Sequence, residues 1–489
     1  MIRILSNSFK LPNRSQLRFN SSFTNIKLSI INSRPRPSSS ISRNLQSKLY
    51  QTRFQSHHFN LSKRFINLQS NSNHQKVPDL TSPIVAHHLL IVATLVFSIV
   101  VVGGLTRLTE SGLSITEWNL ISGTLPPLSE QEWFSEFEKY KKTPEFKLLN
   151  QSIDLDSFKT IYLWEWSHRM IGRLIGLTFL LPIPFFIRYK LIRSQQIKLG
   201  LFGIGTLIGA QGGLGWYMVK SGLDQSELNK RDGIPRVSQY RLAAHLAMAF
   251  VVYGSCLRLA GGILRDWRLF YQNLPIGGMN TSVLESVKVL ESKVPMRARG
   301  LVHSVTGLVF LTAVSGAFVA GLDAGLVYNT FPLMGDHLIP PKSELISTTI
   351  TNRNEGRPGW IRNIFENPTT VQFDHRVLAS LTFTSIIGLF TYLTKKKTSL
   401  PPTTSLWIRS MLGMVSIQVG LGISTLVYLV PTSLAAAHQA GSLVLLSLSI
   451  ATGISLRKPN RRIFLQYLDL MKSKKTHLKP IEFHNVKSN

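Results

Sequence analysis

The sequence predicts an all-α polytopic membrane protein, with eight transmembrane helices arranged as two pseudo-symmetric four-helix bundles. The 489 residues are 44% hydrophobic and only 16% charged. Eight segments approach the length of about 20 mostly apolar residues that a bilayer-crossing helix needs, and short motifs of the first half recur in the second. The formal charge of +30 could suit nucleic acid, but basic residues lie between apolar spans, so no nucleic-acid partner is expected.

A basic segment precedes the first apolar span. Residues 1–76 contain thirteen Lys or Arg, sixteen Ser and no Asp or Glu. This composition, without the apolar run of a secretory signal, is typical of a mitochondrial transit peptide. A merely disordered basic N-terminus is the alternative.

The apolar segments give a transmembrane topology. An even number of spans places both chain ends on one side. The loops 188–198 and 395–409 hold eight basic residues and no acid, whereas the segment 107–159 holds nine acids and six bases. The positive-inside rule then predicts a multi-pass protein of the mitochondrial inner membrane with both termini in the matrix. The predicted spans are 84–106, 163–187, 198–219, 240–260, 300–322, 373–393, 405–429 and 433–456.

The two halves of the chain repeat. HRMIGRLIGL begins at His168 and HRVLASLTFT at His375, while QGGLGW begins at Gln211 and QVGLGI at Gln418, both pairs at an offset of 207 residues. Four spans per half is an even number, so the copies share one orientation about an axis along the membrane normal. We expect an N-terminal bundle (84–260), a matrix linker (261–299), a C-terminal bundle (300–456) and a basic matrix tail (457–489).

Small residues in the spans have structural interpretations. Gly205, Gly209 and Gly213 recur at four-residue spacing. No strand precedes them, as a nucleotide-binding loop requires, so close helix packing is expected. The lone cysteine, Cys256, excludes an intrachain disulfide and a cysteine-based metal cluster.

Four histidines lie at matching positions near the starts of the second, fourth, sixth and eighth spans. They are His168, His245, His375 and His438, and the tripeptide AAH ends at the second and the fourth of them. All four spans enter the membrane from one side, so their imidazoles are expected at similar depth. A single histidine at a helix entrance commonly only hydrogen-bonds at the interface. Matched pairs inside a membrane point instead to function.

Two imidazoles per half restrict the kind of metal site. Zinc takes four ligands, or three and a water, and carboxylate-bridged di-iron sites need Glu-x-x-His on two helices, of which only one copy is present. Haem iron takes two axial ligands from opposite sides of the macrocycle, so one haem per half is predicted. Haem propionates could meet Arg169, Arg376 and Arg241. Interfacial arginines that reach lipid phosphates are the alternative.

One carboxylate distinguishes the two halves. Glu165 lies three residues before His168, on the same helix face, and Gln372 stands at the equivalent position before His375. A carboxylate can accept a proton or stabilise a developing cation, whereas an amide cannot accept the proton. The N-terminal site is therefore predicted to perform chemistry and the C-terminal site to hold a permanent haem. A Glu165–Arg169 pair that only stabilises the helix is the competing interpretation.

These motifs resemble the haem A synthase family in its mitochondrial form, over residues 84–456. The likeness includes GGLTRLTESGLSITEWNLISGTLPP from Gly103, EWSHRMIGRLIGL from Glu165 and NTFPLMG from Asn329. It implies eight transmembrane helices in two similar bundles. It also implies an oxidoreductase that converts the C8 methyl of haem O, through an alcohol, to the formyl group of haem A for cytochrome c oxidase.

The resemblance also implies roles for particular residues and partners. His375 and His438 would bind the iron of a resident haem b, His168 and His245 would flank the substrate haem O, and Glu165 would be the essential carboxylate. Electrons are expected from ferredoxin and ferredoxin reductase on the matrix side. Haem O synthase, oxidase assembly factors and a homo-oligomer are further expected partners. Some bacterial members have a cysteine pair in the first external loop; residues 107–159 have none, so a disulfide-based electron route does not transfer.

Two other functions fit the pattern less well. A dihaem b-type electron carrier working across the bilayer would hold its histidine pairs at two depths, whereas all four are expected near one face. A duplicated-bundle transporter tends to have interrupted helices and polar groups near the midplane. The titratable residues here cluster at helix entrances instead.

Overall fold

The computed structural model describes residues 79–118, 125–223, 237–271, 281–352, 358–396 and 400–477. The predicted transit peptide, residues 1–76, and the end of the C-terminal tail lie outside the described residues. Within the described ranges the regular structure is helical, and the one β-type pairing is an isolated bridge between Met334 and His337. The predicted all-α class is confirmed.

Eight helices in the described part of the chain are long and apolar enough to cross a membrane, and each matches one predicted span. The eight-span prediction is therefore confirmed. The spanning helices are α2 (Pro83–Leu108), α5 (Leu155–Leu180) with α6 (Ile183–Arg188), α7 (Gln195–Gly222), α9 (Gln239–Asp266), α11 (Lys293–Gly321), α15 (Pro368–Lys395), α16 (Pro402–Val427) and α17 (Thr432–Ser455).

Helix α5 begins well before the predicted boundary at residue 163. Asp154 caps it, since its side chain accepts a hydrogen bond from the Ser157 N–H. The first turns also carry an ion pair between Asp156 and Lys159. Apolar composition reveals only the part of a helix that suits lipid, so these polar turns escaped the prediction.

The expected linker 261–299 is largely helical where it is described. α9 continues to Asp266, the π-helix η2 (Trp267–Tyr271) follows, and α10 (Thr281–Glu291) leads directly into α11 at Lys293. Phe270, Val283 and Tyr467 meet in a small apolar cluster. This cluster ties η2 and α10 to α18 (Arg461–His477).

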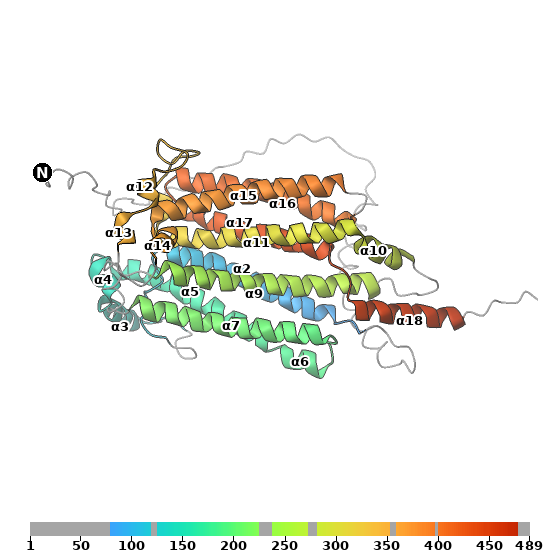
Figure 1. Ribbon diagram of the computed structural model, residues 1–489. Coiled ribbons are helices and arrows are strands. Elements are labelled where there is room, and N and C mark those ends of the chain that lie inside the picture. Colours follow the sequence, from blue (N-terminus) through green and yellow to red (C-terminus); the bar gives the residue numbers. More distant parts are fainter. Residues whose placement is uncertain are drawn as a thin grey trace, which may run out of the picture. The chain divides into compact units, whose positions relative to one another are not determined.

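Short helices lie at the two ends of the spanning helices (Figure 1). One end carries α3 (Glu130–Lys141), α4 (Pro144–Leu148), α12 (Lys342–Leu345), α13 (Thr348–Thr351) and α14 (Gly359–Glu366). The other end carries α6, α10 and α18. Successive connections thus alternate between the ends, as an eight-span topology requires.

The contacts between spanning helices repeat in the two halves. α2 contacts α5 and α9, and α7 contacts the same two helices, which closes a ring of four. α11 and α16 contact α15 and α17 in the same way. The halves meet where α9 contacts α11 and α17, and where α2 contacts α17. The description as two pseudo-symmetric bundles is our interpretation of this repeat.

The glycines at four-residue spacing on α7 do not all pack closely. A methyl group on Gly205 would lie 3.1 Å from the Phe179 ring. Methyl groups on Gly209 or Gly213 would meet no described atom within 4 Å. The expectation of close packing along all three was therefore wrong, because α7 turns other residues, such as Gly200 and Gly215, toward α9.

A close backbone approach between the halves generates a test of the fold. A methyl group on Gly321 of α11 would lie 2.7 Å from the Cβ and 2.9 Å from the Cα of Gln239 in α9. Because a backbone atom cannot move aside cheaply, Gly321→Ala should cost about 1–3 kcal/mol of stability. The thermal unfolding midpoint of the purified protein in detergent measures this.

Gly307→Ala is the control, since a methyl group at this position of α11 would meet no described atom within 4 Å. Equal midpoints for the two variants would contradict the packing of α11 on α9.

Candidate active site

His168 of α5 and His245 of α9 face each other across the ring of α2, α5, α7 and α9. Their ring centroids lie 6.4 Å apart, with the planes at 57°. Two imidazoles on opposite sides of one metal ion, each bound through a nitrogen at about 2.0 Å, hold their centroids about 6 Å apart. The pair is therefore spaced for a single metal ion between the rings.

Each imidazole of this pair packs against a glycine of a neighbouring helix. A methyl group on Gly103 of α2 would lie 2.9 Å from Nε2 of His168. One on Gly215 of α7 would lie 3.3 Å from Cε1 of His245. Any larger residue would push the rings out of their present positions. These glycines thus leave space that the imidazoles use.

The second half repeats this arrangement. A methyl group on Gly316 of α11 would lie 3.3 Å from Cε1 of His375, and one on Gly422 of α16 would lie 3.0 Å from Cε1 of His438. The second pair thus comes from α15 and α17, which are the counterparts of α5 and α9.

The repeated glutamines hold the helices that carry two of the histidines. The Gln211 side-chain amide donates to the backbone oxygen of His245 over 2.9 Å, and the Gln418 amide donates to that of His438 over the same distance. The His375 Nδ1 lies 2.7 Å from Ser315 Oγ. The equal offset of the His and Gln motifs therefore reflects an equivalent hydrogen bond in each half.

The donor set restricts what the pairs can bind. Nδ1 of His245 and of His438 are buried and have no hydrogen-bond partner among the described atoms, an arrangement that costs free energy. No group of three or more His, Cys, Asp or Glu within the described residues could hold a metal ion. Two imidazoles can complete the coordination of a metal ion whose other ligands come from a cofactor. Haem iron, with its equatorial positions filled by the macrocycle, fits both pairs.

Glu165 is buried, with an exposed fraction of 3%. One carboxylate oxygen accepts from Ser114 Oγ and from the Ile115 N–H, both at 2.8 Å. The other accepts from Nη2 and Nε of Arg169, at 2.6 and 3.1 Å. An ionised carboxylate only accepts hydrogen bonds, so four donors match the charged group. The sequence predicted the pair with Arg169 as one alternative but not the bonds to the loop.

The equivalent position in the second half has the opposite polarity. Gln372 is equally buried, and its amide donates to the Tyr328 oxygen at 2.9 Å. Its own oxygen, and Nε of Arg376, have no partner in the described structure. In the first half the loop donates to the side chain, whereas in the second half the side chain donates to the loop.

The two predicted arginines hold the loops that follow α2 and α11. Arg169 donates to the backbone oxygens of Ile115 and Glu117, at 2.9 and 2.8 Å. Arg376 donates to those of Tyr328 and Thr330, at 3.1 and 3.0 Å. The guanidinium groups of Arg169 and Arg376 thus donate to backbone oxygens, and their role at haem propionates remains a prediction. Arg241 similarly contacts Ser221 and stacks on Tyr217.

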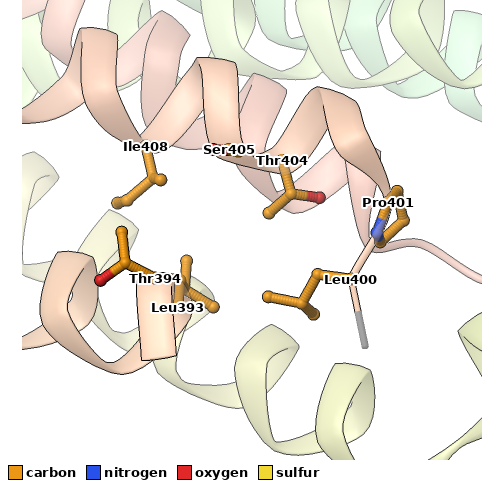
Figure 2. A pocket seen from close by; sticks show the side chains of 7 residues that line it. All are labelled: Leu393, Thr394, Leu400, Pro401, Thr404, Ser405 and Ile408. Carbon is orange, nitrogen blue, oxygen red and sulfur yellow. The ribbon is translucent and has the colours of Figure 1, made fainter. Parts of the chain in front are cut away.

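A small cavity between α15 and α16 lies far from both pairs. Figure 2 shows its lining, with Leu393 and Thr394 at one wall. Leu393 is 18 residues along α15 from His375, which corresponds to about 27 Å at 1.5 Å per residue. This cavity therefore takes no part in the site. Its other lining residues are Leu400, Pro401, Thr404, Ser405 and Ile408.

Comparisons with known proteins show the family to which the chain belongs. The family model described as cytochrome oxidase assembly protein, COX15-CtaA, matches residues 86–450. Heme A synthase COX15 of Saccharomyces cerevisiae is 48% identical over 381 residues, which cover 78% of this chain and 76% of that protein. This chain belongs to the haem A synthase family.

Two further members of the haem A synthase family are informative. Heme A synthase COX15 of Homo sapiens is 45% identical over 364 residues, covering 74% of this chain and 80% of the human protein. A heme A synthase-mitochondrial ferredoxin fusion protein of Schizosaccharomyces pombe is 46% identical over 380 residues, covering 77% of this chain and 60% of the fusion.

The loop contacts of the two arginines generate a paired test. Arg169→Gln should expose the backbone of residues 111–118, and Arg376→Gln that of residues 327–334, because each removes charged hydrogen bonds worth about 1.5–3 kcal/mol. Hydrogen exchange read by mass spectrometry should accelerate about tenfold or more, only in the loop that the replaced arginine holds. Unchanged exchange, or equal acceleration of both loops by one variant, would contradict this account.

Proposed function

We propose that this chain oxidises the C8 methyl of haem O to the formyl group of haem A, which cytochrome c oxidase requires. The chain is thus a haem A synthase, an oxidoreductase of haem A biosynthesis. The similarity to the curated haem A synthases over about three quarters of the chain supports this function. The observation that carries the mechanism is the pair of equivalent histidine sites, of which only one has a buried carboxylate beside it.

The two rings of helices take different roles. The N-terminal ring, within residues 84–260, binds the substrate haem O between His168 and His245. The C-terminal ring, within residues 300–456, binds a resident haem b between His375 and His438. When bound, the haem irons supply the redox chemistry. The imidazole spacing of the first pair, and the glycine contacts and unpartnered ring nitrogens found in both halves, support this assignment.

Glu165 acts as the acid–base group of the N-terminal site. One helical turn separates it from His168, so both side chains serve one substrate. Its carboxylate takes up a proton released as the methyl carbon is oxidised and favours positive charge that develops there. Ser114, Ile115 and Arg169 are positioning residues, since their donors fix the carboxylate. Gln372 cannot accept a proton.

The location and the electron donor follow from topology and similarity. The protein lies in the mitochondrial inner membrane with both termini in the matrix, and the basic loops 188–198 and 395–409 support this orientation. Ferredoxin, reduced by its reductase, donates electrons on the matrix side; a relative fused to mitochondrial ferredoxin supports that partner. Haem O synthase, assembly factors and self-association remain expected partners.

Glu165→Gln should abolish conversion of haem O while the resident haem stays bound, because the amide keeps the size of the side chain but cannot accept a proton. Chromatography of haems extracted after incubation with haem O and a reductant measures this. Glu117→Gln is the control, since the Glu117 carboxylate is half exposed and paired with Lys139. Normal haem A production by Glu165→Gln would refute the role of this carboxylate.

His375→Ala should remove the reduced-minus-oxidised absorption spectrum of the resident haem, because one of the two residues that would hold the haem iron is lost. His303→Ala, an exposed histidine on α11 of the same ring, should keep that spectrum. If His375→Ala kept a normal spectrum, the resident haem would not lie between His375 and His438.

A further inference from the structure

We propose that α9, α11 and α17 form a binding site for the phosphates of an anionic membrane lipid, at the end of the spanning helices that carries α6, α10 and α18. Arg258 and Arg265 of α9, Arg299 of α11, and Arg457 just after α17 supply the positive charge. This end is the matrix side in the proposed orientation. Arg258 lies 13 residues along α9 from His245, about 20 Å at 1.5 Å per residue. The site is therefore separate from the histidine pairs and goes beyond the proposed function.

The contact between α9 and α11 brings two of the arginines to similar depth. The ring centroids of Phe250 in α9 and Phe310 in α11 lie 6.4 Å apart, and the two helices run in opposite directions. Arg258 follows Phe250 by eight residues, about 12 Å, and Arg299 precedes Phe310 by eleven, about 16 Å. Eleven residues are about three helical turns, so Arg299 lies on the face of α11 that meets α9. The two arginines therefore differ in depth by about one turn.

Helix α17 brings a third arginine to the same part of α9. A methyl group on Gly254 would lie 3.3 Å from a side-chain atom of α17, and one on Gly262 would collide with Nη1 of Arg457. Arg258 lies four residues from each of these glycines and so shares their side of α9. Nη2 of Arg457 donates to Oδ2 of Asp266 over 3.1 Å. These contacts hold the Arg457 guanidinium against the turn of α9 that follows Arg258.

The positive charge of this site is only partly neutralised. The buried Asp266 carboxylate makes the one ion pair that these four arginines have among the described residues, which leaves an excess of three positive charges. Nη1 of Arg265 is buried without a hydrogen-bond partner among the described atoms, an arrangement that is costly for a charged donor. Arg258 is exposed and Arg299 is partly exposed. A phosphate supplies both the negative charge and the acceptor oxygens that the arginines lack.

The surroundings favour a lipid over a soluble anion. Arg258 lies within the helical segment Gln239–Phe270, which is long and apolar enough to cross a membrane. Val251, two turns deeper on the same face, is 41% exposed. A lipid brings acyl chains to this apolar surface and phosphates to the arginines, as basic clusters between spanning helices require. Because one phosphodiester carries a single negative charge, a lipid with two phosphates matches the excess charge better than a lipid with one.

The test measures lipid binding by the full-length protein, purified in detergent and freed of lipid. Cardiolipin with two phosphates, phosphatidylglycerol with one, and zwitterionic phosphatidylcholine are added in turn, and bound lipid is counted by native mass spectrometry. We expect saturable binding of cardiolipin, weaker binding of phosphatidylglycerol and still weaker binding of phosphatidylcholine. Arg258→Gln/Arg299→Gln should bind cardiolipin about 25-fold more weakly, since each arginine near lipid phosphate contributes about fivefold to affinity.

Two matched double variants separate this site from general charge. Arg188→Gln/Arg193→Gln removes the same charge from exposed positions at the end of α6 and in the connection to α7, and should keep the wild-type affinity. Arg258→Lys/Arg299→Lys retains both charges and should keep most of the affinity. Cardiolipin should raise the thermal unfolding midpoint of wild type more than that of the Gln pair. If the Gln pair does not fold, Arg258→Gln alone decides, with an expected loss of about fivefold.

Equal cardiolipin affinities of wild type and the Gln pair, or an equal loss in the variant at the α6–α7 connection, would overturn the site. Equally tight binding of phosphatidylglycerol would contradict the match to two phosphates. Displacement of the lipid by inorganic phosphate would indicate a site for a free anion. Unchanged lipid binding together with weaker binding of ferredoxin would assign the arginines to a protein partner instead.

Discussion

The structure depends on one constraint, the approach of two imidazoles from opposite helices of a four-helix ring. His168 and His245 can approach to 6.4 Å between ring centroids only because Gly103 and Gly215 leave room on the intervening helices. Gln211 then ties α7 to the backbone of His245. Two imidazole nitrogens must reach one metal ion within the membrane. This requirement explains the helix positions, the glycine positions and the repeated motifs.

The two halves differ in the buried side chain that precedes the first histidine of each. Duplication preserved the imidazoles, the glycines and the glutamines, but the residue one turn before the first histidine of each half differs. Glu165 accepts hydrogen bonds from its loop and from Arg169, whereas Gln372 donates to the equivalent loop. One exchanged side chain thereby reverses the polarity of a buried network and gives only one half a buried carboxylate at this position.

The sequence predicted the eight spans, the family and the function, and each was confirmed. Apolar length and repeated polar motifs are strong signals within lipid, where few polar residues are tolerated. The long N-terminal extension of α5 was missed because its turns are polar, and the packing of Gly209 and Gly213 was wrong because spacing alone does not tell which face meets a neighbour. Ser114 and the Ile115 N–H were missed because contacts between a loop and a side chain 51 and 50 residues away leave no periodic signal. The two-bundle description and the residue roles remain predictions.

An experimental density map of the purified protein loaded with haem O tests the central claim most directly. The account predicts one porphyrin in each ring of helices, with one iron between His168 and His245, another between His375 and His438, and Glu165 beside the first porphyrin alone. Porphyrin density outside these pairs, or imidazoles turned away from the iron in both halves, would contradict it.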